Sequence, residues 1–164
     1  MPSRSLHDMS DRDLAALITY LRSQPAVAHT VGKRHLTWMS CLILGAHAFE
    51  MSHTLPVSGP VADVPEGMTS AYGEYMTKLL TCRDCHGPDL KGGRRDQFPP
   101  VGPNLLALVS THELAQFDGA LRRGTSARDG HSLDPTKMPY LTFANLNDSE
   151  VGAIYTYLQT LAKK

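Results

Sequence analysis

The sequence of 164 residues predicts a small all-α domain with long loops over residues 69–164. Apolar side chains recur at helical spacing in several segments, and no useful length of alternating apolar and polar residues indicates a strand. Eleven prolines and thirteen glycines favour loops between the helices. They are too few for a disordered or collagen-like chain.

The first expected helix covers residues 11–21, and Ser10 with Asp13 three residues later is typical of an N-cap and an acidic first turn. Its apolar face consists of Leu14, Leu17, Ile18 and Leu21. The apolar run 36–49 has 14 residues. Because a membrane-spanning helix needs about 20, no transmembrane helix is predicted. The prolines of residues 51–68 predict a linker.

A second helix is expected over residues 70–80, directly before Cys82, and the segment 87–103 is rich in glycine and proline and therefore predicts a loop. Ser110 followed by Glu113 favours a capping box for the next helix, which ends at Gly124 and carries Leu114, Phe117 and Leu121.

A further loop, 124–139, precedes the clearest helix of the sequence. Asn147 with Glu150 is typical of its first turn. One helical face then carries Val151, Ile154, Tyr155, Leu158 and Leu161.

An internal repeat appears when the chain is compared with itself at an offset of 137 residues. The identical pairs are Met1 and Met138, Pro2 and Pro139, Asp11 and Asp148, Ala16 and Ala153, Thr19 and Thr156, Tyr20 and Tyr157, and Leu21 and Leu158. We therefore expect residues 1–25 to be the final loop and helix of a preceding domain, 26–68 a linker with a short apolar segment, and 69–164 a complete domain. The alternative is that two amphipathic helices are similar by chance.

The strongest chemical motif is Cys82-Arg83-Asp84-Cys85-His86, the C-x-x-C-H pattern of covalent c-type haem attachment. Residues i and i+3 project from the same side of a helical turn, so both thiols can add to the vinyl groups of one porphyrin edge. His86 then supplies an imidazole to the iron.

Two other interpretations of this motif are weaker. A thioredoxin-like dithiol would follow a strand and open a helix, whereas Cys82 follows a predicted helix. A zinc site needs four ligands, and only the scattered His112 and His131 follow downstream.

The second axial ligand of the iron has three candidates, which are Met138, His112 and His131. Met138 is favoured because it stands before Pro139 in a stiff loop, where a thioether can be held toward iron.

The motif, together with Tyr72-Gly73-Glu74-Tyr75, Gly102-Pro103-Asn104-Leu105 and Met138-Pro139, resembles a class I cytochrome c. The chain is most similar to bacterial cytochromes that carry two such domains in tandem. This resemblance implies three to five helices around a covalently bound haem, with helices 72–80 and 147–161 crossing. Gly73 and Tyr75 would pack there against Tyr155 or Tyr157.

The resemblance also implies a set of haem-binding residues. His86 would be the proximal ligand, Met138 the distal ligand, and the carbonyl of Pro103 would accept the imidazole N–H. Asn104 and Leu105 belong to the same expected haem-binding segment.

The chain departs from the family pattern in three respects. Thr81 replaces the glycine that often precedes the first cysteine, Gly119 interrupts a predicted helix, and no C-x-x-C-H precedes the first helix, so that Met1 holds the place of a distal ligand. The chain thus resembles the C-terminal part of a diheme cytochrome, as a truncated product, a fragment, or the result of a gene start placed too late.

The segment 33–48 has two interpretations. Its basic, apolar and small-residue regions imitate an internal export signal. The preferred alternative is a linker helix packed between domains, in which Cys41 is a buried small apolar residue.

These observations predict an electron carrier with one haem c, not an enzyme, in the periplasm or another extracytoplasmic space. We expect a redox protein as donor and another as acceptor, a second cytochrome c domain fused or paired with it, and membrane association only through a complex. The balance of 16 basic and 16 acidic side chains argues against a nucleic-acid partner.

Two alternative functions are a cytochrome subunit of a larger dehydrogenase or reductase complex, and a haem enzyme or sensor with an open iron site. A set of basic residues is expected to be solvated surface, or else a rim that balances haem propionates or docks an acidic partner: Lys91, Arg94, Arg95, Arg122, Arg123 and Arg128.

Overall fold

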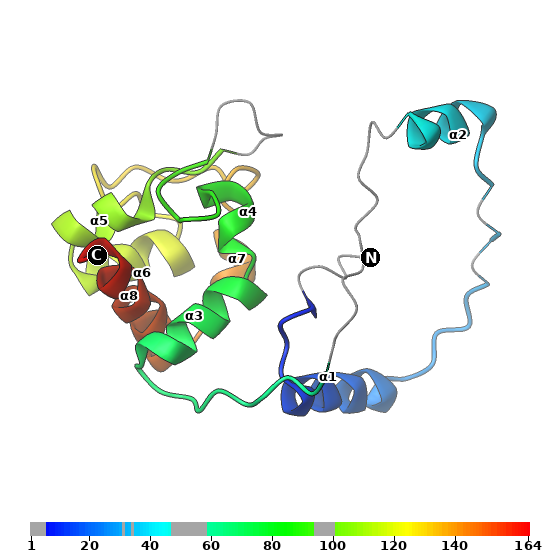
Figure 1. Cartoon of the computed structure of the whole chain (residues 1–164), viewed down its shortest axis with the longest axis horizontal. Helices are drawn as coiled ribbons and strands as arrows, with labels where there is room; N and C mark the ends of the chain where they lie inside the picture. The colour runs from blue at the N-terminus through cyan, green and yellow to red at the C-terminus, as the bar shows by residue number, and fades with distance from the viewer. Residues whose placement is uncertain (1–5, 31, 34, 47–58, 94–100) are drawn as a thin grey trace. The chain divides into compact units, whose positions relative to one another are not determined.

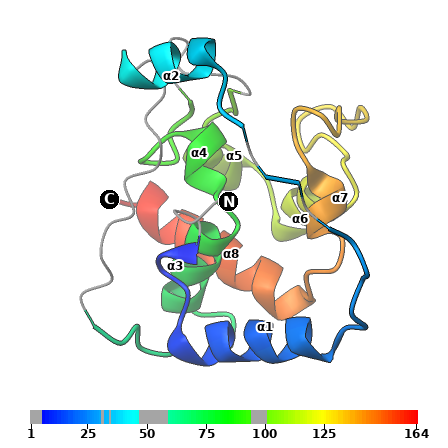
Figure 2. The same ribbon diagram turned by 90° about the vertical axis from the view of Figure 1, so that its right-hand side faces the viewer.

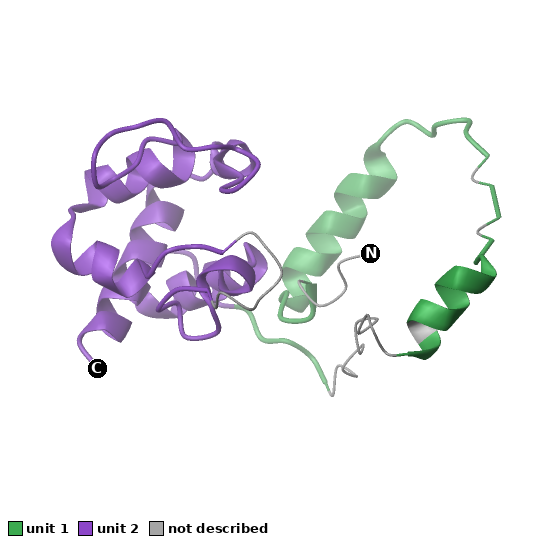
Figure 3. Cartoon of the chain, turned by 90° about the horizontal axis from the view of Figure 1, so that it is seen from above, with its two compact units in different colours: residues 1–63 green, residues 64–164 purple. Residues whose placement is uncertain are grey.

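The computed structural model describes residues 6–30, 32–33, 35–46, 59–93 and 101–164. The chain divides into unit 1, residues 1–63, and unit 2, residues 64–164 (Figure 3). The helices of unit 1 are α1 (Asp11–Ser23) and α2 (Trp38–Gly45). Those of unit 2 are α3 (Ser70–Leu79), α4 (Cys82–His86), α5 (Leu105–Thr111), α6 (Leu114–Arg122), α7 (Tyr140–Phe143) and α8 (Asp148–Ala162). Within these described ranges the only β feature is an isolated bridge between Thr125 and Ser132, so the all-α prediction is confirmed.

The helices α3 and α8 cross and form the centre of unit 2 (Figures 1 and 2). Each begins at a side-chain cap: Thr69 Oγ1 accepts the N–H of Tyr72 at 3.2 Å, and Asn147 Oδ1 accepts the N–H of Glu150 at 2.9 Å. A Cβ atom on Gly73 would collide with the carbonyl oxygen of Ala153. The lack of a side chain at Gly73 therefore lets the two helices approach closely.

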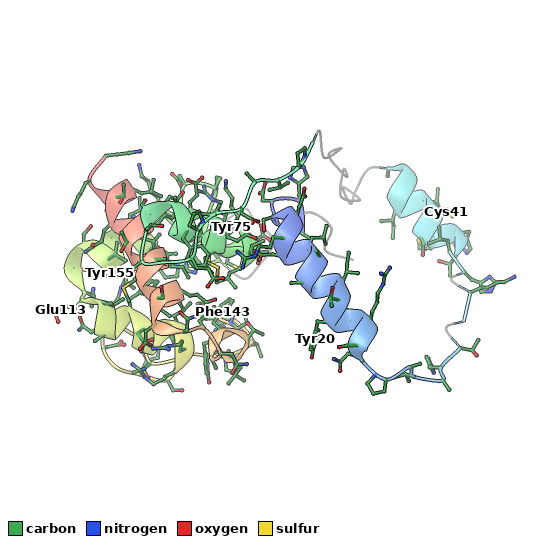
Figure 4. All side chains as sticks on the ribbon, turned by 90° about the horizontal axis from the view of Figure 1, so that it is seen from below. Tyr20, Cys41, Tyr75, Glu113, Phe143 and Tyr155 are labelled. Carbon is green, nitrogen blue, oxygen red and sulfur yellow. The ribbon has the colours of Figure 1, made fainter. Side chains whose placement is uncertain are left out.

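The helices α5 and α6 pack against the other side of the core, where they also contact α8. The rings of Phe117 and Tyr155 lie 5.7 Å apart between centroids, and the Tyr155 hydroxyl donates to the carbonyl of His112 at 2.9 Å. Figure 4 shows Tyr75 and Tyr155 on the two crossing helices. The ring of Tyr75 stacks on Tyr72. Gly73 faces Ala153 and Tyr157. The packing that was expected for Gly73 at the crossing is therefore present.

The sequence-based helix starting near Ser110 was placed wrongly. Residues 105–111 form α5, and the hydroxyl of Ser110 donates to Leu106 within that helix. The next helix, α6, begins after Glu113, whose N–H donates to Gln116 at 3.0 Å. The capping residues of α6 are therefore Glu113 and Gln116. The sequence analysis also did not predict the short helix α7.

Unit 1 contains the predicted first helix, capped as expected, since Ser10 Oγ accepts the N–H of Asp13 at 3.1 Å. The backbone N–H of Asp11 donates to Val61 at 3.2 Å. Cys41 lies on α2 (Figure 4), and its expected burial is wrong: its side chain is exposed, because the described residues of unit 1 provide no core around α2.

The described residues contain no helix with enough length and apolar character to cross a membrane. Parts of several sequence-based expectations lie outside the described residues: Met1, Pro2, Arg34, His47, Ala48, the segment 51–58, Arg94 and Arg95.

Candidate haem site

The two cysteines of the motif lie on the single turn of α4, which follows α3 after Leu80 and Thr81. Thr81 has φ +54°, in the left-handed region that costs a β-branched residue about 1–2 kcal/mol. This conformation explains why glycine would suit the position. Arg83 fixes the turn, because its guanidinium donates to the carbonyl of Pro88 and to the hydroxyl of Tyr157 on α8, the latter at 2.7 Å.

The imidazole of His86 is buried, with only 6% of the residue exposed, and its orientation is fixed. Burial lowers the pKa of His86, although a hydrogen bond to the carbonyl of Pro103 opposes the shift. That bond joins Nδ1 to the oxygen at 2.8 Å, so Nδ1 carries the proton and Nε2 keeps a lone pair for a metal. The bond implied by the family resemblance is therefore present.

The loop after α4 is held against the motif by its backbone. The N–H of Gly102 donates to the carbonyl of Cys85 at 2.8 Å, and that of Gly92 donates to His86 at 2.8 Å. A Cβ atom on Gly102 would lie 2.6 Å from Cε1 of His86. Gly102 thus leaves room for the imidazole directly before Pro103.

A cavity of about 500 Å³ brings together six of the seven predicted site residues. They are Cys82, Cys85, His86, Pro103, Leu105 and Met138. Such a volume is within the usual range for bound cofactors. The seventh residue, Asn104, is not among the lining residues of the described chain and instead caps α5, where its Oδ1 accepts the N–H of Ala107 at 2.9 Å.

Apolar side chains from distant parts of the sequence complete the cavity wall. The sequence analysis assigned Phe117, Leu121 and Ile154 to helix faces but not to the site, and it assigned no place to Leu108 and Phe143. Helical periodicity identifies an inward face. It does not distinguish a face that packs on other helices from one that lines a cavity.

The loop that bears Met138 follows α6 and is ordered by local hydrogen bonds. The N–H of Met138 donates to the carbonyl of Asp134 at 2.9 Å, and the pKa of Asp134 lies below its usual range because Thr136 donates to its carboxylate. A Cβ atom on Gly124, at φ +66°, would collide with the ring of Tyr140, two residues beyond Met138.

The two histidines that competed with Met138 occupy different environments. His112 does not line the cavity, and its Nδ1 lies 3.2 Å from the carbonyl of Leu108. His131 does line the cavity, and its Nδ1 lies 2.6 Å from a carboxylate oxygen of Asp129. His131 therefore remains the competing candidate.

The thiols do not have the character of an activated redox pair. Burial raises the pKa of Cys82 to about 12, and burial together with Asp84 raises the pKa of Cys85. An activated dithiol has a lowered pKa. In the described part of the chain, moreover, no group of three or more His, Cys, Asp or Glu side chains could hold a metal ion such as zinc.

An ion-pair network, not an open basic rim, surrounds two of the predicted basic residues. Arg122 donates to Asp118, to the carbonyl of Leu146 at 2.9 Å and to Asp148 at 2.8 Å. Arg123 donates to the other oxygen of Asp118. Arg122 thus joins the end of α6 to the beginning of α8. It thereby holds together the two ends of the segment that carries Met138. Lys91 and Arg128 are exposed, and Arg128 also lines the cavity, so both the solvated surface and the rim beside the haem stay predictions for these two residues.

The donor set of this cavity fits a haem of the c type: two thiols for the porphyrin edge, an oriented imidazole and a thioether, within a largely apolar wall.

Comparison with known proteins agrees with this chemistry. The sequence profile of the family described as cytochrome c matches residues 71–162. The chain is 30% identical over 156 residues to one of the subunits of nicotinate dehydrogenase from Pseudomonas putida, covering 83% of this chain and 13% of that protein. It is 31% identical over 96 residues to the cytochrome c subunit of the quinone-dependent alcohol dehydrogenase of Gluconobacter oxydans, covering 52% of this chain and 20% of that protein.

A corresponding alcohol dehydrogenase subunit of Gluconacetobacter polyoxogenes is 29% identical over 96 residues, with the same two coverages of 52% and 20%. The chain therefore spans only a small part of the curated relatives that it matches. No solved structure gives a significant match. Because the profile covers more than half of the sequence, the chain belongs to the cytochrome c family, whose cofactor is covalently bound haem c and whose function is electron transfer.

Proposed function

We propose that unit 2 carries one haem c through thioether bonds to Cys82 and Cys85, with His86 and Met138 as the axial ligands. The observation that carries this proposal is that one cavity is lined by the two thiols and the imidazole of the motif on α4 and also by the thioether of Met138, which comes from a distant part of the sequence. When bound, the haem supplies an iron centre that gains and loses a single electron.

Each residue has a distinct part in this arrangement. The cysteines fix the position of the porphyrin, and the Pro103 carbonyl holds His86 in the Nδ1–H form with Nε2 available. Leu105, Phe117 and the other apolar wall residues exclude water from the cavity. A thioether opposite an imidazole raises the reduction potential. Two protein ligands also leave no open iron position for substrate chemistry, which favours a carrier over a haem enzyme.

We further propose that the chain serves as the electron-transfer part of a dehydrogenase and works in the periplasm or another extracytoplasmic space. The names of its relatives support the first point, since they are subunits of nicotinate and alcohol dehydrogenases. In this role unit 2 accepts single electrons from the dehydrogenase and passes them to a second redox protein. Brief and weak contacts suit such an exchange.

The test is to produce the chain behind a periplasmic export signal and to measure its mass and its pyridine haemochrome spectrum. We expect one covalently bound haem per chain, and none in the double variant Cys82→Ser with Cys85→Ser. A matured chain that lacks haem would overturn the proposal.

The distal ligand is tested by Met138→Ala, with Met68→Ala as the matched control because Met68 is 56% exposed and does not line the cavity. We expect the reduced Met138→Ala protein to bind carbon monoxide readily, whereas the parent and the control exclude it. If His131→Ala opens the iron instead, His131 is the ligand and Met138 is not.

A further inference from the structure

The helix α2 of unit 1 (Figure 1) presents large apolar side chains to solvent. Trp38 is 71% exposed, Leu42 is 60% exposed and Met39 is 50% exposed. The helix still has a defined beginning, since Thr37 Oγ1 accepts the N–H of Ser40 at 3.2 Å. Contiguous exposed apolar surface of this kind marks a site of interaction with a protein or a membrane.

The apolar surface of α2 is broad, and the helix has no charged residue. Two neighbouring rows of side chains at the spacing i, i+4 form it, with Trp38 and Leu42 in one row and Met39 and Ile43 in the other. The only hydroxyl side chain of α2 is that of Ser40. A helix that is apolar over most of its surface is normally enclosed by a protein core or by lipid.

The length of the apolar run decides between these two surroundings. Residues 36–49 are 14 in number, fewer than the about 20 needed to cross a bilayer. A run of this length is typical of a core helix, of a segment at the membrane interface, or of the apolar part of an export signal. The exposure of Trp38 and Leu42 excludes a core within the described residues. Two interpretations therefore remain.

The charges around α2 favour a membrane surface. Residues 14–49 contain no aspartate or glutamate, although the whole chain has 16 in 164 residues. The charged residues of this stretch are Arg22, Lys33 and Arg34, and Lys33 is exposed. Unit 2 differs, because its eleven basic and eleven acidic residues are interspersed. An apolar helix beside cations, with no carboxylate nearby, is complementary to a bilayer of anionic lipids.

The same features fit other occupants less well. A second copy of the chain would bring the same cations and, within residues 14–49, no carboxylate to pair with them. A groove on a partner protein takes one face of a helix, whereas the apolar surface of α2 is broad. Trp38 is also of the residue type that is enriched where a membrane meets water.

We propose that residues 33–45 form a membrane-contact segment, in which α2 lies in the interface of an anionic bilayer and Lys33 and Arg34 bind lipid headgroups. The segment lies on the membrane and does not cross it. This inference goes beyond the proposed electron-transfer function and does not depend on the haem. It also differs from the expectation that the chain meets a membrane only through a complex, since here the chain binds lipid directly.

The test is co-sedimentation of the full matured chain with lipid vesicles. One set consists of phosphatidylcholine alone, and the other of phosphatidylcholine and phosphatidylglycerol in equal parts. We expect binding to the anionic vesicles to be roughly tenfold tighter or more, because each cation near the surface adds to the attraction. Added salt should weaken this binding. Trp38 is the only tryptophan of the chain, so its emission should shift to shorter wavelength on the anionic vesicles.

The apolar and the charged contributions are separated by variants. Leu42→Asp should weaken binding to the anionic vesicles roughly tenfold or more, because a carboxylate enters the membrane unfavourably. The matched control is Leu141→Asp in unit 2, where Leu141 is 65% exposed and does not line the cavity. It should bind as the parent does. The double variant Lys33→Gln with Arg34→Gln should lose the preference for anionic vesicles.

Several results would overturn the proposal. They include no binding to either vesicle, equal binding of the parent to both, and equal losses in Leu42→Asp and Leu141→Asp. Cleavage after Ala48, seen in the mass of the exported chain, would identify an export signal instead. Self-association that Leu42→Asp abolishes, without vesicle binding, would make a second copy the occupant. Haem content and carbon monoxide binding, measured in every variant, report separately on the proposed function.

Discussion

The helices α1 and α8 begin with the same kind of cap at equivalent positions of a repeat, yet one is exposed and the other forms the core of a haem-binding unit. The difference lies in their neighbours, because α8 is covered by α3, α5 and α6 within unit 2. Helix formation here is a local property of capping and spacing. Burial depends instead on the helices that pack against each of the two, and it determines which helix contributes to a site.

The largest expected difference between the two copies concerns their equivalent leucines. Leu158→Ala removes a fully buried side chain and should reduce the free energy of unfolding of unit 2 by about 3–5 kcal/mol. Leu21→Ala should change it by less than about 0.5 kcal/mol, since Leu21 is exposed. Denaturant unfolding followed at the haem absorbance measures both values. Equal losses would show that α1 belongs to the same cooperative core.

A second comparison uses one glycine from each unit. In Gly73→Ala the new Cβ atom meets the carbonyl oxygen of Ala153, so α3 and α8 must separate, at a cost of about 3 kcal/mol. Gly45 on α2 has no atom within 4 Å of the equivalent Cβ position. Gly45→Ala should therefore leave the unfolding midpoint of unit 2 unchanged, and a loss comparable to that of Gly73→Ala would contradict this comparison.

The contacts that hold the first residues of α8 and of α1 give a third comparison. Asp148 of α8 binds Arg122, which also binds Asp118, whereas its equivalent Asp11 accepts the N–H of Val61 at 3.3 Å. Burial would raise the pKa of Asp118, but hydrogen bonds from Arg122 and Arg123 outweigh it and lower the pKa. Asp118→Asn should destabilise unit 2 by about 2 kcal/mol at neutral pH.

The pH dependence follows from the lowered pKa of Asp118. Its contribution to stability is complete above the unfolded pKa of about 4 and is lost as the pH falls from there through the native pKa. The parent should therefore lose stability more steeply than Asp118→Asn below pH about 4. Chemical unfolding at a series of pH values measures the slopes. Parallel curves for parent and Asp118→Asn would refute the role of this network.

The smallest expected effect concerns the caps. Asn147→Ala should cost unit 2 about 1 kcal/mol, because the N–H of Glu150 loses its acceptor. Ser10→Ala should reduce the far-ultraviolet helix signal but not move the haem-monitored transition, since α1 is outside the core of unit 2. A shift of that transition by Ser10→Ala would show that the two units unfold together.

The sequence was most informative where local signals agree. Asn147 and Ser10 each marked a true helix start, and the motif from Cys82 to His86 located the site. The capping role predicted for Ser110 was wrong because its hydroxyl donates to a carbonyl within α5. The next helix is capped instead by Glu113 and Gln116. Short helices such as α7 carry too few residues for a periodic signal.

The cavity wall and the network of Arg122 could not be predicted in the same way. Phe117 and Ile154 were recognised as apolar helix positions, but their place in the cavity depends on how α6 and α8 pack. Arg122 was grouped with exposed cations, although it is held by Asp118 and Asp148, which are separated from each other by the whole loop that carries Met138. Contacts between distant segments are set by the tertiary fold. One sequence contains no direct signal for them.

The central claim is that unit 2 exchanges single electrons through a haem closed by His86 and Met138. A potentiometric titration of the matured chain tests it most directly. We predict one reversible one-electron transition, which moves to a lower potential in Met138→Ala because a thioether ligand raises the potential. A chain that shows no transition, or a Met138→Ala variant with the same potential as the parent, would contradict the account.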